Sequence, residues 1–322
     1  MTQLFARLLS PVLILFAAAA AAQPWPGKPV RIIVPYPPGG TVDVVARTLA
    51  QQLVTQLGQQ FVVENRAGAS GTLGSDAVAK SAPDGYTLLC NASIFVINPY
   101  IMQRVPFDVI KDFTAVVNLG QVPLIVAAHP AVPANSLKDF VAVAKANPAR
   151  YAFATSGIGS AGHLTVEMLR REAGLDMLIV PYKGTGPALT DLIGGQVHVM
   201  ADPMPSSYPH VRGGRLKALA QTGKQRAPFL PDVPTVAESG FAGFEMVSWY
   251  GFWGPAGLPA EVVRTLAAET AKAVQAPLVL ERLASQGFIP DGSGPTAFLA
   301  YIKAEMAKYE KVVKEAGIKA QP

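Results

Sequence analysis

Apolar residues recur along this chain in two alternating patterns, short continuous runs and longer stretches with a helical repeat. The short runs predict strands at residues 30–34, 61–64, 86–91, 114–119, 124–128, 151–155, 177–181 and 197–201. The helical repeats predict helices at 42–57, 137–147, 163–173 and 187–193, with a short helix that ends at 80. Strands that alternate with helices indicate an α/β fold built on largely parallel sheets.

From Pro259 onward the pattern is helical, and Pro259, Pro277 and Pro295 stand where three helices are expected to begin. An amphipathic tail without strands needs an apolar surface to cover, so we expect it to pack back on the first part of the chain. The chain then crosses twice between two lobes, near 120–124 and near 247–253. The predicted domains are 23–123 plus 252–322, and 124–251, joined by a hinge with a ligand cleft between them.

Two segments of the chain match each other. Val30–Val34 runs into Pro35-Tyr36-Pro37-Pro38-Gly39-Gly40-Thr41, and Tyr151–Thr155 runs into Ser156-Gly157-Ile158-Gly159-Ser160. Each is a strand, a glycine turn, a hydroxyl residue and a helix, which together form an anion site at a helix N-terminus. Ligands of open α/β sheets bind outside the carboxyl ends of the strands, so we expect both turns to face one cleft.

Neither glycine turn contains a lysine or an arginine. Oriented amides, hydroxyls and waters must then neutralise a bound anion, which favours recognition of carboxylates by hydrogen-bond geometry. Asp43, in the first turn of its helix, either binds ligand or compensates the helix dipole. His163 either contacts ligand or bonds the backbone at its helix start.

The second turn also fits two enzyme motifs in part. Residues 157–162 match G-x-G-x-x-G, but the next strand does not end in the acidic residue that a dinucleotide site needs. Residues 158–162 approach a nucleophile elbow around Ser160, without its first glycine. A secreted serine hydrolase therefore stays open as an alternative. The histidines show no metal-site spacing, and we expect no cofactor and no metal.

The N-terminus has the order of a secretory signal peptide. Arg7 precedes an apolar run, and an alanine tract ends at Ala22. We assign 1–22 to the signal and expect a periplasmic mature protein. The formal charge of +5 is mild and its basic residues are dispersed without interleaved aromatics, so no nucleic-acid partner is expected. The single cysteine, Cys90, lies in an apolar run and cannot form an internal disulfide.

At this point the chain resembles a known family, the Bug family of periplasmic receptors for tripartite tricarboxylate transporters. The resemblance covers nearly the whole mature chain. It is carried by residues 25–31, 34–43, 63–66, 82–88, 156–160, 163–164, 180–184, 187–197 and 231–238.

The resemblance implies a type II periplasmic binding protein fold that closes on its ligand by hinge motion, without catalysis. It implies a monomer whose two glycine turns grip one carboxylate and which meets membrane components of a transporter. The implied ligand-binding residues are Tyr36, Pro38, Gly39, Gly40, Thr41, Asp43, Ser93, Ser156, Gly157, Gly159, Ser160, His163 and Asp202. The chain departs from the common pattern at Ala67 and Pro203, so the resemblance does not name the ligand. A receptor that signals to a sensor partner would use the same pocket and stays open as another alternative.

Overall fold

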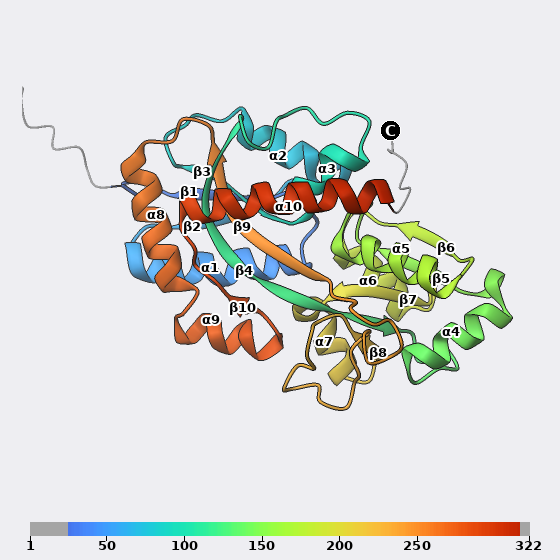
Figure 1. Ribbon diagram of the computed structural model, residues 1–322. Helices are drawn as coiled ribbons and strands as arrows, with labels where there is room; N and C mark the ends of the chain where they lie inside the picture. The colour runs from blue at the N-terminus through green and yellow to red at the C-terminus, as the bar shows by residue number, and fades with distance from the viewer. Residues whose placement is uncertain (1–24, 316–322) are drawn as a thin grey trace, which may run out of the picture.

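The computed structural model describes residues 25–315, so the predicted signal peptide lies outside the described residues. Two lobes lie side by side, and one long strand, β4, runs through both (Figure 1). The sheet order is β2-β1-β3-β9-β4-β7-β5-β6, with β8 and β10 also paired to β4.

The first lobe combines the N-terminal part of the chain with the C-terminal helices. Its sheet places β2, β1 and β3 in parallel, followed by antiparallel β9 and β4. Its strands are β1 (Val30–Val34), β2 (Phe61–Asn65), β3 (Thr87–Ala92), β9 (Val247–Pro255) and β10 (Ile289–Pro290). Its helices are α1 (Thr41–Leu57), α2 (Thr72–Ala79), α3 (Ile94–Ile101), α8 (Ala260–Ala273), α9 (Pro277–Arg282) and α10 (Pro295–Glu315), with 3-10 turns η1 (Ala69–Gly71) and η3 (Ala284–Gln286).

The second lobe holds a smaller sheet in which β5 pairs in parallel with β6 and β7, while β7 and β8 pair antiparallel with β4. Its strands are β5 (Ala152–Thr155), β6 (Leu178–Pro181), β7 (Val199–Pro203) and β8 (Lys217–Gln221). Its helices are α4 (Leu137–Ala146), α5 (Ala161–Ala173), α6 (Thr185–Ile193) and α7 (Met204–Arg212), with the 3-10 turn η2 (Pro148–Arg150).

One strand, β4 (Phe113–Ala128), joins the two lobes. Sequence analysis predicted two strands here, and that prediction is wrong, because Gly120 and Pro123 interrupt the apolar pattern without ending the strand. Residues 113–123 pair with β9, and 124–128 pair with β7 and β8. The sheets are mixed where largely parallel ones were expected, since the strands that cross between the lobes run antiparallel to their neighbours.

The chain returns to the first lobe directly beside the point where it leaves that lobe. β9 begins at Val247, which pairs with Pro123. Residues 247–251, which sequence analysis placed in the second domain, pair with β4 residues of the first lobe. Val247 lies at the start of the segment 247–253, near which the second crossing was expected.

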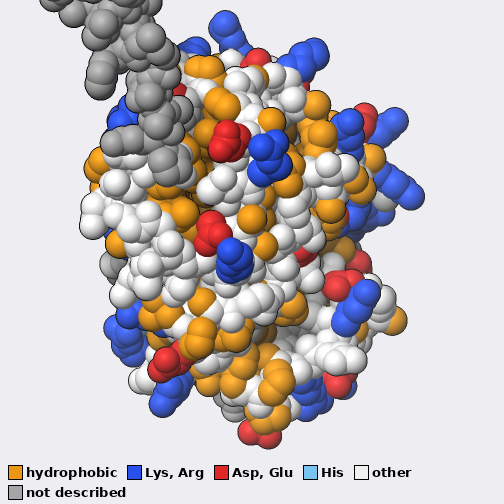
Figure 2. Space-filling model, turned by 90° about the vertical axis from the view of Figure 1, so that its left-hand side faces the viewer, with side chains coloured by type: hydrophobic (Ala, Val, Ile, Leu, Met, Phe, Trp, Pro, Cys, Tyr) orange, Lys and Arg blue, Asp and Glu red, His pale blue; other side chains and the backbone are white. Residues whose placement is uncertain are grey.

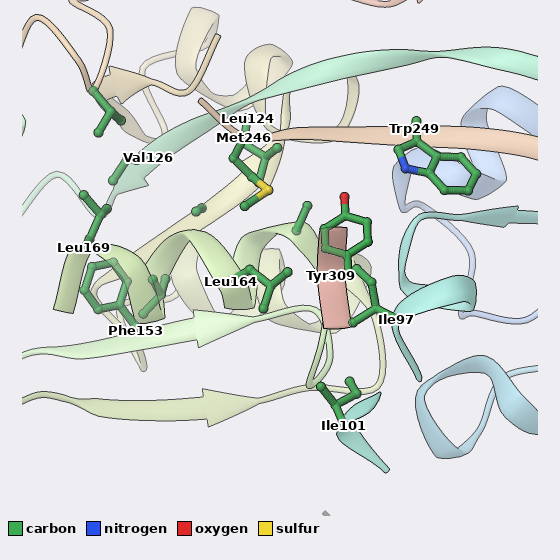
Figure 3. Packing of buried hydrophobic residues seen from close by; sticks show 14 of the residues in the cluster. Ile97, Ile101, Leu124, Val126, Phe153, Leu164, Leu169, Met246, Trp249 and Tyr309 are labelled. Atoms are coloured by element: carbon green, nitrogen blue, oxygen red, sulfur yellow. The ribbon is translucent and has the colours of Figure 1, made fainter. Parts of the chain in front are cut away.

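The apolar core also extends across both lobes. The C-terminal helices pack back on the first lobe as expected, with α8 and α10 against β4. The end of α10 brings Tyr309 into one buried cluster with Leu164 of α5 and Ile97 of α3 (Figure 3). Trp249 of β9 belongs to the same cluster and donates through Nε1 to Glu305 Oε2 at 2.9 Å. The relative placement of the lobes is thus held by packing as well as by the shared strands.

Charged side chains are scattered over the face that carries α8 and α9, among apolar and neutral ones (Figure 2). Ion pairs join neighbours on that face, such as Lys272 with Glu269 at 2.6 Å. Between residues 25 and 315, no helix is both long and apolar enough to cross a membrane.

Candidate functional site

A cavity of about 60 Å³ lies between the lobes, and both glycine turns line it. The start of five helices contributes to its wall: the first residues of α1, α3, α5 and α6, and the N-cap residue of α7. These five residues are Thr41, Ile94, Ala161, Thr185 and Pro203. Because the first backbone amides of a helix have no partner within the helix, this wall presents N–H groups and positive dipole ends.

The first glycine turn is braced by Asp43. Gly39 adopts φ +88°, and its N–H donates to Asp43 Oδ2 at 3.1 Å. The same carboxylate accepts from Arg47 Nε at 3.0 Å and from Asn65 Nδ2 at 2.9 Å. Burial alone raises the pKa of Asp43, but these hydrogen bonds from Arg47, Asn65 and Gly39 bring it below its usual value. The carboxylate is therefore ionised and fully engaged in holding the turn.

The second glycine turn is braced in the same way by His163. Gly159 adopts φ +80°, and its N–H donates to His163 Nδ1 at 3.2 Å. Ser160 caps α5, since its Oγ accepts from the His163 N–H at 3.1 Å. Burial, with the nearby Arg170 charge, lowers the pKa of His163 to about 4, so the ring is neutral at pH 7 and its Nδ1 can accept.

The two turns therefore share one design. In each, a glycine with positive φ precedes the N-cap residue, and the side chain of the third helical residue accepts from that glycine's N–H. An L-residue rarely adopts such a φ, which explains the glycines. In each turn the glycine amide is therefore hydrogen-bonded to the side chain that holds the turn.

The structure brings together the turn residues predicted from sequence, but not all of them reach the cavity. Those that line it are Tyr36, Gly40, Thr41, Asp43, Ser93, Ser156 and Ser160. Those outside its lining are Pro38, Gly39, Gly157, Gly159, His163 and Asp202. Asp43 and His163 support the turns, and Gly159 lies so close to α3 that an added Cβ would come 1.9 Å from Ile101 Cδ1.

Asp202 lies behind the wall, in a hydrogen-bond chain that spans the cleft. Its carboxylate accepts from Thr185 Oγ1 at 3.0 Å and from Ser206 Oγ at 2.5 Å. Ser206 Oγ in turn lies 2.8 Å from Thr41 Oγ1 of the opposite lobe. Asp202 is 0% exposed, and burial raises its pKa to about 7 against the opposing effect of the two hydroxyl donors.

The remaining wall comes from β9 and the start of α3, and sequence analysis missed most of it. Ser248 and Tyr250 of β9 line the cavity beside Ser93. The hydroxyls of Ser93 and Tyr250 are buried without a hydrogen-bond partner of acceptable geometry, although Thr41 and Ser248 lie near Tyr250 and Ser93 lies near Tyr309. Tyr36 is different, since its hydroxyl donates to Asn91 Oδ1 at 2.8 Å.

Thr185 was also missed, although the sequence contained a signal for it. Pro181-Tyr182-Lys183-Gly184-Thr185 repeats, in shorter form, the strand, tyrosine, glycine and threonine of the first turn. Gly184 has φ +141° and Thr185 begins α6 at the cavity. The site therefore has a third strand-to-helix turn.

The arrangement suits binding of an anion. No lysine, arginine or histidine side chain is found among the described residues that line the cavity. Ser160 Oγ caps its helix and lies 3.0 Å from Thr155 Oγ1, with no base against it. Gly162 allows close packing, because a Cβ there would come 2.2 Å from the Ala201 carbonyl. Over residues 25–315, no group of three acidic, histidine or cysteine side chains is placed to hold a metal.

Two α/β lobes, shared strands and a cleft lined by helix N-termini define a periplasmic solute-binding protein, and comparison with known proteins agrees. The pattern of the family described as tripartite tricarboxylate transporter family receptor matches residues 45–318. The chain belongs to this family of binding receptors, which are not enzymes.

Individual relatives extend over nearly the whole chain. The protein BugT of Bordetella pertussis is 39% identical over 320 residues, 97% of this chain and 98% of the relative. The solved structure of the periplasmic binding protein BugD is 35% identical, with a TM-score of 0.89 over 92% of this chain and 100% of that one.

Two further solved structures contain ligands. Rpa4515 of R. palustris with adipate is 34% identical, with a TM-score of 0.89 over 92% of this chain and 100% of its own. MatC from Rhodopseudomonas palustris with bound malate is 32% identical, with a TM-score of 0.84 over 89% and 99%.

Proposed function

We propose that this receptor captures a small carboxylate in the periplasm, after cleavage of residues 1–22, and delivers it to the membrane components of a tripartite tricarboxylate transporter. The observation that carries the proposal is the convergence of five helix starts on a cavity whose described lining holds no cationic side chain. Helix N-termini favour anions, and each is worth about 0.3–1 kcal/mol or more when partly buried. The adipate and malate bound by two relatives support a carboxylate.

We further propose that Gly40, Thr41, Ser160 and their neighbouring amides hold the carboxylate. Asp43 and His163 act on it indirectly, by fixing the two turns. Of the thirteen residues predicted from sequence, those that line the cavity, apart from Asp43, are the candidates for direct contact.

Capture is proposed to proceed by closure of the lobes, one comprising residues 23–123 plus 252–322 and the other 124–251, with 247–251 moving with the first. The lobes already touch across the cleft. A Cβ on Gly40 would come 3.3 Å from Thr185 Cβ, and one on Gly184 would come 2.8 Å from Pro37 Cδ. A monomer suffices for this function, since both turns belong to one chain.

The test is a thermal-shift screen followed by calorimetry, with carboxylates, sugars and nucleotides as separate classes. A ligand that binds only the folded state raises the free energy of unfolding by mass action, by about 2.7 kcal/mol when its concentration is 100 times Kd. The melting temperature rises as a result. We expect hits among carboxylates. Hits confined to sugars or nucleotides would refute the proposal.

A glycine variant tests the position of the site. Gly40 has φ −85°, which valine tolerates, so Gly40→Val adds bulk at the cleft without backbone strain. We expect binding to fall at least tenfold while the fold is kept. Gly294→Val is the matched control, because a Cβ there meets nothing within 4 Å. Equal binding by both variants would place the site elsewhere.

A further inference from the structure

Two hydroxyls in the cavity wall lack a hydrogen-bond partner of good geometry. Ser93 and Tyr250 are each 1% exposed and line the cavity, and the neighbouring hydroxyls of Thr41, Ser248 and Tyr309 do not satisfy their side-chain oxygens. A buried polar group without a partner destabilises the protein, and a ligand that supplies the missing hydrogen bond removes that cost. Both belong to the first lobe, on β9 and at the start of α3, and not to the glycine turns. They mark a second polar position in the same cavity, one suited to a neutral group that donates or accepts a hydrogen bond.

The described lining offers no cationic side chain to balance a second negative charge. Thr41, Ser248 and Thr185 add only neutral hydroxyls to it. The acidic groups nearest to it are Asp43, which lines the cavity and is paired with Arg47, and Asp202, whose carboxylate accepts from Thr185 behind the wall. A first carboxylate has the starts of α1 and α5, whereas a second, placed at Ser93 and Tyr250, would have only the start of α3 and neutral hydroxyls. Like charges held close in a buried site disfavour each other's ionised form.

The space is also small. At about 60 Å³ the cavity has less than half the volume of the roughly 150 Å³ apolar cavity that accommodates benzene. A chain of many carbons does not fit the cavity in this arrangement of the lobes.

We infer that the ligand is a short monocarboxylate that carries a neutral hydroxyl or carbonyl group, bound by Ser93 and Tyr250, and that dicarboxylates are disfavoured. This inference rests on the proposed function and narrows it to a substrate class. A site built to hydrogen-bond a ligand group rejects analogues that lack it, because the protein's own polar groups are then left unpaired.

Calorimetry with matched probes tests the inference. Lactate and pyruvate carry the neutral polar group, propionate has the same length without it, malate adds a second carboxylate, and adipate adds length and a second carboxylate. We expect lactate or pyruvate to bind at least tenfold tighter than propionate, malate and adipate. Propionate binding as tightly as lactate and pyruvate would overturn the role of the hydroxyls, and malate or adipate binding tightest would overturn the monocarboxylate class.

Both of those results would leave the proposed function intact, because every probe is a carboxylate. Failure of all five, together with hits in another ligand class, would instead remove the proposed function.

Single substitutions test whether Ser93 and Tyr250 cause the preference for lactate or pyruvate over propionate. Tyr250→Phe and Ser93→Ala remove one hydroxyl each with little change in shape, and each is expected to reduce the preference for lactate or pyruvate over propionate at least fivefold. Tyr151→Phe, in the core of the second lobe and outside the cavity lining, is the control and keeps the preference. If both hydroxyl variants keep it as well, the second polar position is wrongly assigned.

Asp202→Asn tests the charge behind the wall. Removing this carboxylate is expected to raise the affinity for malate relative to lactate at least threefold at pH 8. An unchanged ratio would show that Asp202 does not exclude a second carboxylate.

Discussion

Replacing Asp202 by asparagine is expected to change how the free energy of unfolding depends on pH. Asp202 is fully buried and accepts hydrogen bonds from Thr185 and Ser206. Asparagine has nearly the same shape and keeps one acceptor for Thr185. Ser206 Oγ can then accept from the new amide while it donates to the Pro203 carbonyl, which lies 2.9 Å away. The variant should therefore fold, and it carries no charge at this position.

The magnitude follows from the pKa of Asp202, which burial raises from 3.8 to about 7. A group whose pKa is raised on folding is protonated in the native state over a range in which it is ionised in the unfolded state. Its contribution is fully present below pH 3.8 and is lost as the pH rises through about 7. With 1.36 kcal/mol for each pKa unit, the wild type should lose about 4 kcal/mol relative to Asp202→Asn between pH 4 and pH 8.

Urea unfolding of both proteins at intervals from pH 4 to pH 8, followed by circular dichroism, measures this difference. All other titrating groups are common to the two proteins, so the difference between their unfolding free energies isolates residue 202. A difference that stays constant with pH would refute the reasoning. It would mean that the hydroxyl donors and the nearby helix starts stabilise the ionised carboxylate as well as water does.

Three further predictions concern the glycine turns. Asp43→Ala leaves the Gly39 amide without its acceptor and should lower stability by about 1–3 kcal/mol and weaken ligand binding, as denaturant unfolding and calorimetry would show; normal values for both would exclude the brace. The pKa of His163 is lowered to about 4, so this residue should cost about 3 kcal/mol of stability as the pH falls from 6.5 to 4; His163→Gln, which can still accept from Gly159, should flatten that slope in acid unfolding experiments. Ser160→Ala removes a helix cap and should cost about 1 kcal/mol, and thermal unfolding that matches the wild type would contradict the capping geometry.

The sequence predicted the repeating elements of the fold but not the strands that join the lobes. Apolar periodicity located α1 and α5 closely, because their buried faces are continuous. It failed at β4, where Gly120 and Pro123 resemble a loop but lie in a strand with irregular register. It also missed α3 and α7, since Pro99 and Pro209 stand inside them, and proline weakens any prediction of a helix interior.

Part of the candidate site could be predicted from local sequence order, and part could not. Local order along the chain was enough to find the glycine turns, because strand, turn and helix follow one another there. Ser248 and Tyr250 reach the cavity only through pairing of β9 with strands far away in sequence, which no local pattern encodes. Whether Asp43 and His163 bind ligand or brace their turns depended on side-chain geometry, and the sequence left both possibilities open.

Pro123 of β4 pairs with Val247 of β9 where the chain passes between the lobes in both directions, so the backbone link at that point is two-stranded. Such a link bends readily across its face and resists bending in its plane, so opening should follow one dominant axis. The displacement of each lobe during opening then grows with distance from the Pro123–Val247 pair. The groove of about 890 Å³ that Gln121, Pro123 and Val247 help to line lies beside this hinge. A pair of fluorophores placed at the far tips of the lobes would therefore report ligand capture with the largest change in separation, which makes the chain a natural scaffold for an optical sensor.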